Sequence, residues 1–303
     1  MIAHFYLLSK SFQNNFTLSN EEIEEKVKRL AEDVKLINQY KDTNKLYANY
    51  NELYPQMFYS DYTIETFICN PVELKKNGID RDVINALQNI FNKSQSTTIT
   101  SKEVEKDLLS WVDENNCHGL IAFHKINGID DNLQIIYGID SWYKFRRHFL
   151  GKYPKNADFF ISECIKYFPN LFFHERNRVT IKTILDDSPK KIVYHLSALN
   201  DRFRDCQYDG LNRTEILKRF SVYAKLDEEA SLEGDAFRKN AFTFNFINND
   251  RINEPVCCEP HLKLCKNDYD RAKYFNDRRI YFHEGKSNIQ RGRILIGHIG
   301  THL

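Results

Sequence analysis

Hydrophobic positions along the chain alternate between helical and strand-like spacing. Apolar residues that recur every three or four positions predict amphipathic helices. Asp80 is the type of residue that caps a helix N-terminus, and Asn212 with Glu215 has the pattern of a capping box. The predicted helices cover residues 19–40, 80–91, 102–115, 141–150, 157–168, 179–185 and 191–199, with a further helix that begins at Asn212.

Other segments have the composition of β-strands. Residues 2–9 read as a first strand, and residues 47–69 are rich in Tyr, Phe, Ile and Thr, which are common in strands. The apolar runs 119–123 and 133–137 are separated by the turn-forming residues of 127–131. Two short apolar runs joined by such a turn predict a β-hairpin.

Residues 92–101 are polar, short of apolar anchors and without periodicity, which is typical of a linker. Helices dominate up to the last quarter of the chain, where strand-like spacing returns. We therefore predict an α+β fold with mixed helical N-terminal and middle regions and a C-terminal antiparallel β-sheet. The predicted regions are an α+β segment at 1–100, a largely helical segment with the hairpin at 101–245, and the sheet at 246–303.

Composition narrows the class of protein. The 303 residues are 42% hydrophobic and 28% charged, which excludes a disordered chain and a disulfide-stapled mini-protein. Lys and Arg number 43 against 42 for Asp and Glu, so only local basic patches are candidates for nucleic-acid binding. Seven cysteines, an odd number, fit reduced thiols. No apolar stretch approaches the roughly 18 residues that span a bilayer, and the N-terminus lacks the pattern of a signal peptide, so we expect a cytoplasmic protein with no membrane partner.

Candidate chemistry concentrates after residue 257, where four of the ten histidines lie. Alternate residues of a strand share one face, so Glu259, His261 and Lys263 are expected to project together. By the same spacing, His298 and His302 share a face of the last strand. The strands are predicted over residues 259–265, 278–283 and 293–303.

Three segments of this region follow one another along the chain: Glu259-Pro-His-Leu-Lys, Arg279-Ile-Tyr-Phe and Ile294-Leu-Ile-Gly-His-Ile-Gly-Thr-His-Leu. They resemble the RelE/YoeB superfamily of bacterial ribonuclease toxins. In that family a Glu-Pro-Leu-Lys-like strand is followed by a strand with Arg and aromatic residues. An apolar last strand then carries a catalytic His or Tyr. The resemblance covers only the last fifth of the chain and leaves the role of residues 1–245 open.

The resemblance implies RNA cleavage without a metal or another cofactor, by a toxin or an anti-phage-defence nuclease. Glu259 would be the general base on the 2′-hydroxyl, and Arg279 or Lys263 would stabilise the charge on phosphorus. His302 or His298 would protonate the leaving oxygen. General acid–base catalysis and electrostatic stabilisation require these residue types in any case.

Two other functions fit the same residues. His261, Lys263 and Asp268 match the His-x-Lys-x4-Asp pattern of phospholipase-D-like phosphodiesterases, in which His attacks phosphorus. That enzyme class needs two copies of the pattern, which a homodimer would supply. The alternative from another class is a non-catalytic sensor or scaffold that binds a partner protein or nucleic acid. Cys257 and Cys258 lie near His261 without the paired spacing of a zinc site, so we expect no metal ligands.

Basic residues elsewhere are candidates for contacts with nucleic acid, for which RNA is the expected partner beside a neutralising or sensing protein. Arg146 and Arg147 stand among aromatic residues, a mixture typical of RNA-binding surfaces. Arg278 and Arg293 belong to the basic C-terminal segment. On a helix, however, the aromatic residues at 142, 145 and 149 share one side, which also fits a core stripe with solvated arginines.

Overall fold

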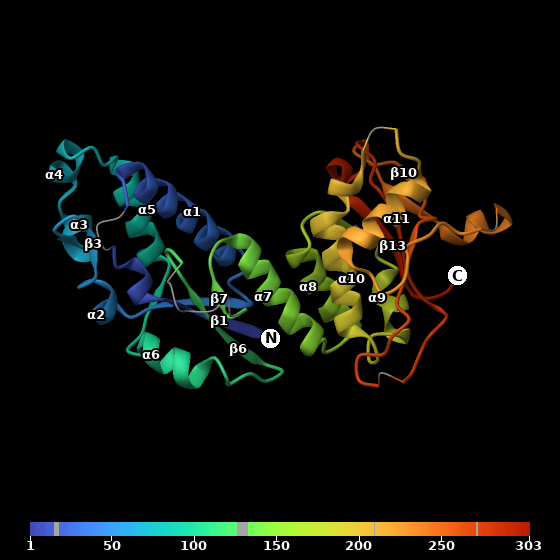
Figure 1. Ribbon diagram of the computed structural model, residues 1–303, viewed down its shortest axis with the longest axis horizontal. Coiled ribbons are helices and arrows are strands. Elements are labelled where there is room, and N and C mark those ends of the chain that lie inside the picture. The colour runs from blue at the N-terminus through green and yellow to red at the C-terminus, as the bar shows by residue number, and fades with distance from the viewer. Residues whose placement is uncertain (15–17, 126–132, 209, 235, 271) are drawn as a thin grey trace. The chain divides into compact units, whose positions relative to one another are not determined.

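The protein is described here from a computed structural model that covers residues 1–303 except 15–17, 126–132, 209, 235 and 271. The fold is α+β, as the sequence predicts (Figure 1). Contacts divide the chain into two compact units, Met1–Phe145 (unit 1) and Arg146–Leu303 (unit 2). Residues 101–145 thus belong to unit 1, although composition grouped them with the middle region.

Unit 1 is built on a five-stranded sheet in which every pair of neighbouring strands is parallel. The strand order is β5-β2-β1-β6-β7, so β1 lies at the centre. Helices α1 and α5 cover one face, and the short helix α6 lies on the other (Figure 1). The strands are β1 (Ile2–Leu7), β2 (Asn44–Ala48), β5 (Gln95–Ser96), β6 (Asn116–Ile121) and β7 (Ile135–Ile136), and the covering helices are α1 (Asn20–Gln39), α5 (Arg81–Asn92) and α6 (Ser101–Glu103).

The long helices of unit 1 begin where the sequence predicts. The Ser19 side chain accepts a hydrogen bond from Glu22 N, and the Glu22 carboxylate accepts one from Ser19 N, a capping box that opens α1. Asp80 caps α5 through Asp82 N. The apolar side of α1 is fully buried, so both helices are fixed by a cap and by a packed face. The other elements of unit 1 are α2 (Tyr50–Leu53), β3 (Met57–Tyr59), β4 (Tyr62–Thr63), α3 (Ile64–Cys69), α4 (Pro71–Lys76), the 3-10 helix Ser9–Phe12 and the π-helix Val104–Leu108.

Three predictions for unit 1 are wrong. The runs 119–123 and 133–137 contribute β6 and β7, which pair in parallel, so they do not form a hairpin. The predicted turn at 127–131 lies outside the described residues. The supposed linker 92–101 contains β5, which extends the sheet beside β2. Residues 47–69 contain the short strands β3 and β4 that their composition favours, but Asn49 and Thr63 cap the helices α2 and α3 before and after them, so the expectation of strands throughout is wrong.

Unit 2 carries a four-stranded sheet with the order β11-β12-β13-β8. Its first three strands are antiparallel, which confirms the predicted C-terminal sheet. The fourth strand, β8, was not predicted and pairs in parallel with β13. Antiparallel β9 and β10 form a separate two-stranded sheet. The strands are β8 (Leu171–Phe173), β9 (Thr243–Ile247), β10 (Asn253–Cys257), β11 (His261–Lys263), β12 (Arg278–His283) and β13 (Ile294–Thr301).

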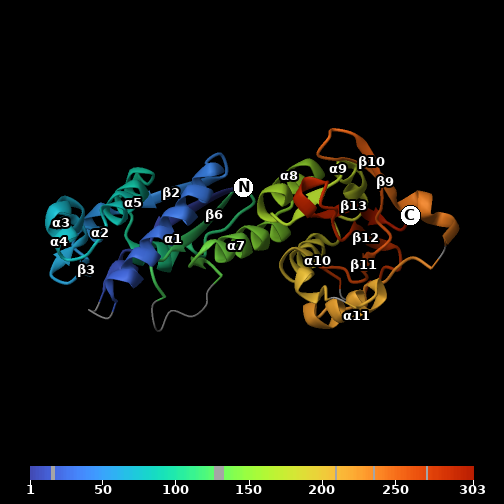
Figure 2. The ribbon, with the colours of Figure 1, turned by 90° about the horizontal axis from the view of Figure 1, so that it is seen from above.

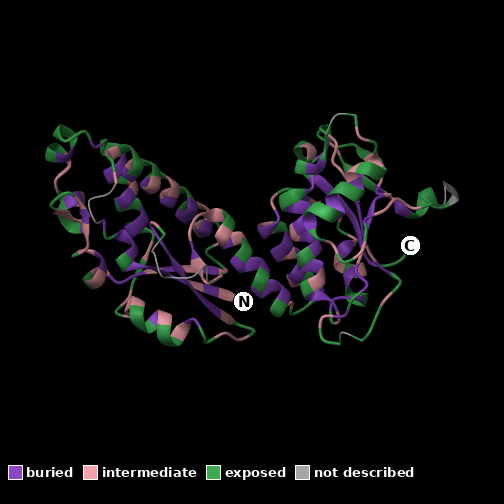
Figure 3. Ribbon diagram, viewed as in Figure 1, coloured by how far each residue is buried: buried purple, intermediate pink, exposed green. Residues whose placement is uncertain are grey.

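Helices of unit 2 lie beside this sheet (Figure 2). Their apolar residues and those of β8, β12 and β13 form one hydrophobic cluster, and a second cluster of Phe side chains from β9 and its surroundings packs on the other side of β12 and β13. The strands are buried on both sides over much of their length (Figure 3). The helices are α7 (Ile139–Lys152), which crosses the division between the units, α8 (Ala157–Tyr167), α9 (Asn177–Thr180), α10 (Pro189–Arg202), α11 (Arg213–Ala224) and the 3-10 helices Ile181–Thr183, Arg204–Cys206, Ala236–Phe242 and Gln290–Gly292.

Candidate active site on the C-terminal sheet

Three strands of unit 2 present a row of ring side chains on one face. His261 of β11 lies opposite Tyr281 of β12, which in turn lies opposite His298 of β13. The ring centroids are 5.2 Å apart for the first pair and 6.0 Å apart for the second. The next row on this face pairs Lys263 with Arg279. We call the polar face the set His261, Lys263, Arg279, Tyr281, His298 and His302.

A β-bulge in β13 brings His298 to this face. The register pairs Phe282 with Ile296 but Tyr281 with His298, so Gly297 is an extra residue in β13. Ile296 belongs to the cluster packed against the helices, and His298 instead lies against Tyr281. Without the extra residue, strict alternation would place His298 on the side of Ile296. Gly297 also suits its position, because a Cβ there would lie 2.3 Å from the Phe244 ring.

A carboxylate that the sequence analysis missed lies at the centre of the polar face. Ser231 forms an antiparallel bridge with His261, so Glu233, two residues further, reaches the same face. Glu233 Oε1 accepts a hydrogen bond from the Tyr281 hydroxyl at 2.7 Å. The same oxygen lies 3.4 Å from His261 Nδ1 and 3.2 Å from His302 Nε2. No spacing motif marks Glu233, because it reaches the site through a single bridge rather than a strand.

Two of the three histidines are held in their neutral form. Burial lowers the pKa of His261 to about 4, opposed by the charge of Glu233 and helped by Arg279. Burial also lowers the pKa of His298 to about 4, against a hydrogen bond from Nε2 to Thr301 O of 2.8 Å. A neutral imidazole cannot protonate a leaving group. His302 is far more exposed than these two and therefore remains as the candidate acid.

The low pKa of His298 predicts a pH-dependent stability. Its pKa in the folded chain lies below the ordinary value of 6.5, so folding disfavours protonation. Its stabilising contribution is present above pH 6.5 and is lost as the pH falls toward 4. Urea unfolding followed by circular dichroism measures the free energy of unfolding at each pH. Between pH 6.5 and 4, this free energy should fall by up to about 3 kcal/mol more in wild type than in His298→Asn. Parallel curves for the two proteins would show that His298 does not carry this dependence.

Glu259 lies with a different set of charges. It precedes β11, and its carboxylate lies 3.6 Å from Arg213 NH1. Arg213 also donates to both carboxylate oxygens of Glu284, at 2.6 and 2.9 Å. The Glu259 carboxylate is therefore paired with Arg213, and only the Glu259 backbone oxygen approaches the polar face, 3.4 Å from His261 Nδ1. No described contact joins Glu259 to Arg279 or His302. Among the described residues, Glu233 takes the place at the polar face that the sequence analysis gave to Glu259.

Cations stand beside the histidines. Arg279 NH1 donates to Arg278 O at 2.9 Å, and its Nε is buried without a hydrogen-bond partner among the described residues. The positive charges of Arg279 and Lys263 both lower the pKa of His261, which places them within electrostatic reach of its ring. Arg238 NH2 lies 3.5 Å from His302 Nδ1. The polar face thus combines cations, imidazoles and one carboxylate.

Three of the four arginines predicted to contact nucleic acid are buried. Arg146 is 3% exposed and pairs with Glu163 at 2.9 Å. Arg147 is 4% exposed and donates to Tyr167 O and Asp201. Arg278 is 6% exposed and pairs with Asp187 at 2.6 Å. The three arginines pair with acidic side chains of unit 2, so their assignment to a nucleic-acid surface is wrong. The alternative of solvated arginines at 146 and 147 is wrong as well.

Arg293, the fourth of these arginines, is exposed. The aromatic side chains at 142, 145 and 149 are buried, which confirms the core stripe. In the phospholipase-D-like pattern, His261 and Lys263 do share a face. Asp268 lies apart from them and accepts hydrogen bonds from Lys190 N and Lys191 N at the start of α10.

Among the described residues, no group of three or more His, Cys, Asp or Glu side chains is arranged to hold a metal ion. None of the helices that the structure describes has the length and apolar character needed to cross a membrane. Comparisons of the chain with protein-family models, with curated proteins and with solved structures find no match. The geometry of the polar face is therefore the basis on which a function can be inferred.

Proposed function

We propose that the polar face cleaves phosphodiester bonds of RNA, with Glu233 and His302 as the proton-transferring pair. The observation that carries the proposal is the 3.2 Å contact between the Glu233 carboxylate and His302 Nε2, on a face that also holds Arg279 and Lys263. Cleavage at a 2′-hydroxyl needs a base, an acid and fixed positive charge around phosphorus. The polar face brings all three together.

Each proton transfer can be assigned to one atom of the Glu233–His302 pair. The 2′-oxygen attacks phosphorus as its proton passes to Glu233 Oε2, the oxygen not used by Tyr281 and His302. Arg238 NH2, which lies 3.5 Å from His302 Nδ1, has to leave that nitrogen for a phosphate oxygen before Nδ1 carries a proton. Protonated His302 then releases the proton from Nδ1 to the 5′-oxygen as the P–O bond breaks. The products are a 2′,3′-cyclic phosphate and a free 5′-hydroxyl. Base and acid thus act from opposite ends of the pair, as an in-line displacement requires.

Tyr281 and the cations complete the site. Burial and the hydrogen bond to Glu233 raise the pKa of Tyr281, so its hydroxyl stays protonated and continues to donate to the carboxylate. Arg279 is suited to the negative oxygens of the phosphorane, since a guanidinium can bind two oxygens at once. Lys263, opposite Arg279 in the register, adds a second positive charge.

The RNA proposal predicts an absolute requirement for the 2′-hydroxyl. Purified protein should cleave an RNA oligonucleotide and leave a cyclic phosphate detectable by mass spectrometry. The same oligonucleotide with 2′-deoxy sugars throughout should stay intact, because the attacking oxygen is missing. Equal cleavage of both substrates would contradict the proposal. RNA that stays intact after incubation with wild type would also contradict the proposal and would favour a sensor or scaffold that binds a partner protein.

Cleavage of the deoxy substrate would favour the phospholipase-D-like alternative, in which His261 attacks phosphorus. The shared face of His261 and Lys263 supports that alternative. Against it, His261 is 4% exposed, its Nε2 contacts Ser231 Oγ at 3.1 Å and its Nδ1 faces Glu233. A nucleophile needs a free and accessible lone pair, so the RNA proposal fits the geometry better.

A further inference from the structure

Unit 1 contains a second cluster of cations, at the carboxyl edge of its parallel sheet. From β1 the chain builds outward through β2 to β5 and then returns to the other side of β1 to form β6 and β7. The direction of winding therefore reverses between β1 and β6. In open parallel sheets, ligands bind outside the carboxyl ends of the strands at such a reversal. The side chains at this edge of unit 1 are therefore candidates for contacts with a ligand.

Two basic residues of α1 converge on this edge. Arg29 NH1 donates to the Tyr137 hydroxyl at 2.7 Å, and Arg29 NH2 donates to Phe123 O at 2.9 Å. Lys26 Nζ lies 3.4 Å from the same hydroxyl. Phe123 follows β6 and Tyr137 follows β7, so Arg29 reaches the carboxyl ends of both strands and Lys26 reaches that of β7. One phenol oxygen thus lies between two positive charges.

The positive charge at this edge is only partly compensated. Within the described part of the chain, neither Lys26 nor Arg29 forms an ion pair within 4.0 Å. The charge of Arg29 acts on the Asp33 carboxyl, one turn further along α1. Burial raises the pKa of Asp33 to about 6, although the charge of Arg29 opposes the shift, and its carboxyl accepts a hydrogen bond from Ile139 N. The Asp33 carboxyl is therefore hydrogen-bonded to the backbone of Ile139 and only partly balances the charge of Arg29.

Two polar atoms in the same place lack partners. Arg29 Nε and His124 Nδ1 are buried and make no hydrogen bond to any residue that the structure describes. His124 directly follows Phe123, and the charge of Lys26 acts on its ring. For the Tyr137 phenol, burial alone would raise the pKa, but the hydrogen bonds and charges of Arg29 and Lys26 lower it below its ordinary value. The two cations therefore favour a negatively charged group beside them.

We propose that this edge of unit 1 is a binding site for a phosphate group, held by Lys26, Arg29 and His124. A phosphate oxygen would replace the Tyr137 hydroxyl as the partner of the two cations and reach the free nitrogens of Arg29 and His124. A guanidinium and an ammonium together suit the charge and geometry of phosphate. The phosphate belongs either to a nucleotide, which the position beside the sheet reversal, at the carboxyl ends of β6 and β7, favours, or to the free ion. The site is independent of the polar face in unit 2.

Isothermal titration calorimetry of the full chain tests the site with ADP, inorganic phosphate and adenosine as probes. We expect ADP to bind and adenosine not to bind. ADP binding more tightly than phosphate would assign a nucleotide, and equal affinities would assign the free ion. Both results support the phosphate site. Absence of binding by ADP and phosphate at millimolar concentration, or adenosine binding as tightly as ADP, would overturn it.

Variants of α1 locate the site. Lys26→Gln should weaken binding about tenfold or more, the effect of losing one charge-assisted contact. Lys26→Arg keeps the charge and should bind within about threefold of wild type. Lys28→Gln is the matched control, because Lys28 lies on the exposed side of the same helix and pairs with Glu24. Equal weakening by Lys26→Gln and Lys28→Gln would mean non-specific attraction and would refute the site.

Discussion

Replacing His302 with alanine is expected to lower the rate of RNA cleavage by about 10²–10⁴-fold, the usual contribution of a general acid. The variant should still fold, because the His302 side chain is about one-third exposed and its ring contacts lie at the end of β13. The measurement is the initial rate on a labelled RNA oligonucleotide, beside the unfolding curve of each variant. Loss of activity with an unchanged curve assigns chemistry rather than stability to this residue.

Two further variants make this experiment specific. Glu233→Gln keeps the shape of the side chain but removes its charge, so it should slow cleavage to a similar extent. His283→Ala is the matched control. His283 lies in the same sheet, with 3.8 Å between its Nδ1 and the Glu284 carboxylate, and none of its described contacts is with Glu233 or His302. Full activity of His302→Ala, or equal losses in His302→Ala and His283→Ala, would remove His302 from the mechanism.

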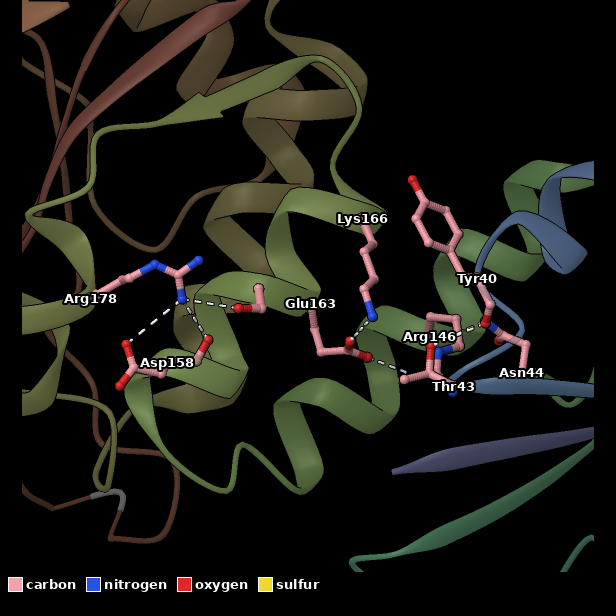
Figure 4. A network of polar contacts seen from close by, with 9 residues as sticks. Tyr40, Thr43, Asn44, Arg146, Asp158, Glu163, Lys166 and Arg178 are labelled. Carbon is pink, nitrogen blue, oxygen red and sulfur yellow. Dashed lines mark hydrogen bonds and ion pairs between the residues drawn. The ribbon is translucent and has the colours of Figure 1, made fainter.

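Replacing Glu163 with alanine is expected to destabilise unit 2 by about 3–5 kcal/mol, since the carboxylate belongs to a buried ion pair. Glu163 accepts from Arg146 at 2.9 Å and from Lys166 at 2.9 Å (Figure 4). The side chains of Glu163 and Arg146 are only 3% and 2% exposed. Removal of the carboxylate leaves the buried guanidinium without this partner. Urea unfolding of the full chain measures the loss.

The same helix offers a control for this loss. Asp158 of α8 lies 3.7 Å from Arg178, and its side chain is 71% exposed (Figure 4). Exposed pairs contribute about 1 kcal/mol or less, so Asp158→Ala should leave the unfolding midpoint nearly unchanged. The backbone contact from Arg178 NH1 to Asp158 O also survives that substitution. A loss below about 1 kcal/mol for Glu163→Ala would show that this buried pair stabilises unit 2 no more than an exposed pair does.

Sequence patterns predicted the helices far better than the sheet of unit 1. Caps at Asp80 and Asn212 are local signals, and both are formed as expected. Strand direction is not local. A fully buried strand such as β6 has the same apolar letters in a hairpin as in a parallel sheet. Strands of two residues, such as β5, are too short for any periodicity to appear.

The candidate site was predicted in part. His261 and Lys263 share a face as alternation requires, and Tyr281 and Arg279 lie beside them. For β13, alternation within 298–302 held, but the bulge at Gly297 decides which side that half of the strand presents. Tertiary context supplied the rest, namely Glu233 in place of Glu259 at the polar face and the burial of basic residues that looked like surface charges.

The strand β8 determines whether the C-terminal segment of unit 2 could fold without the rest of the chain. It comes from the middle of the chain, yet it closes one edge of β13 along Ile294–Ile296. A fragment beginning at residue 246 would leave three apolar residues on an open hydrogen-bonding edge, which invites self-association. It would also lack Glu233. A fragment that keeps the polar face complete therefore has to extend from before Leu171 to His302, which directly follows β13.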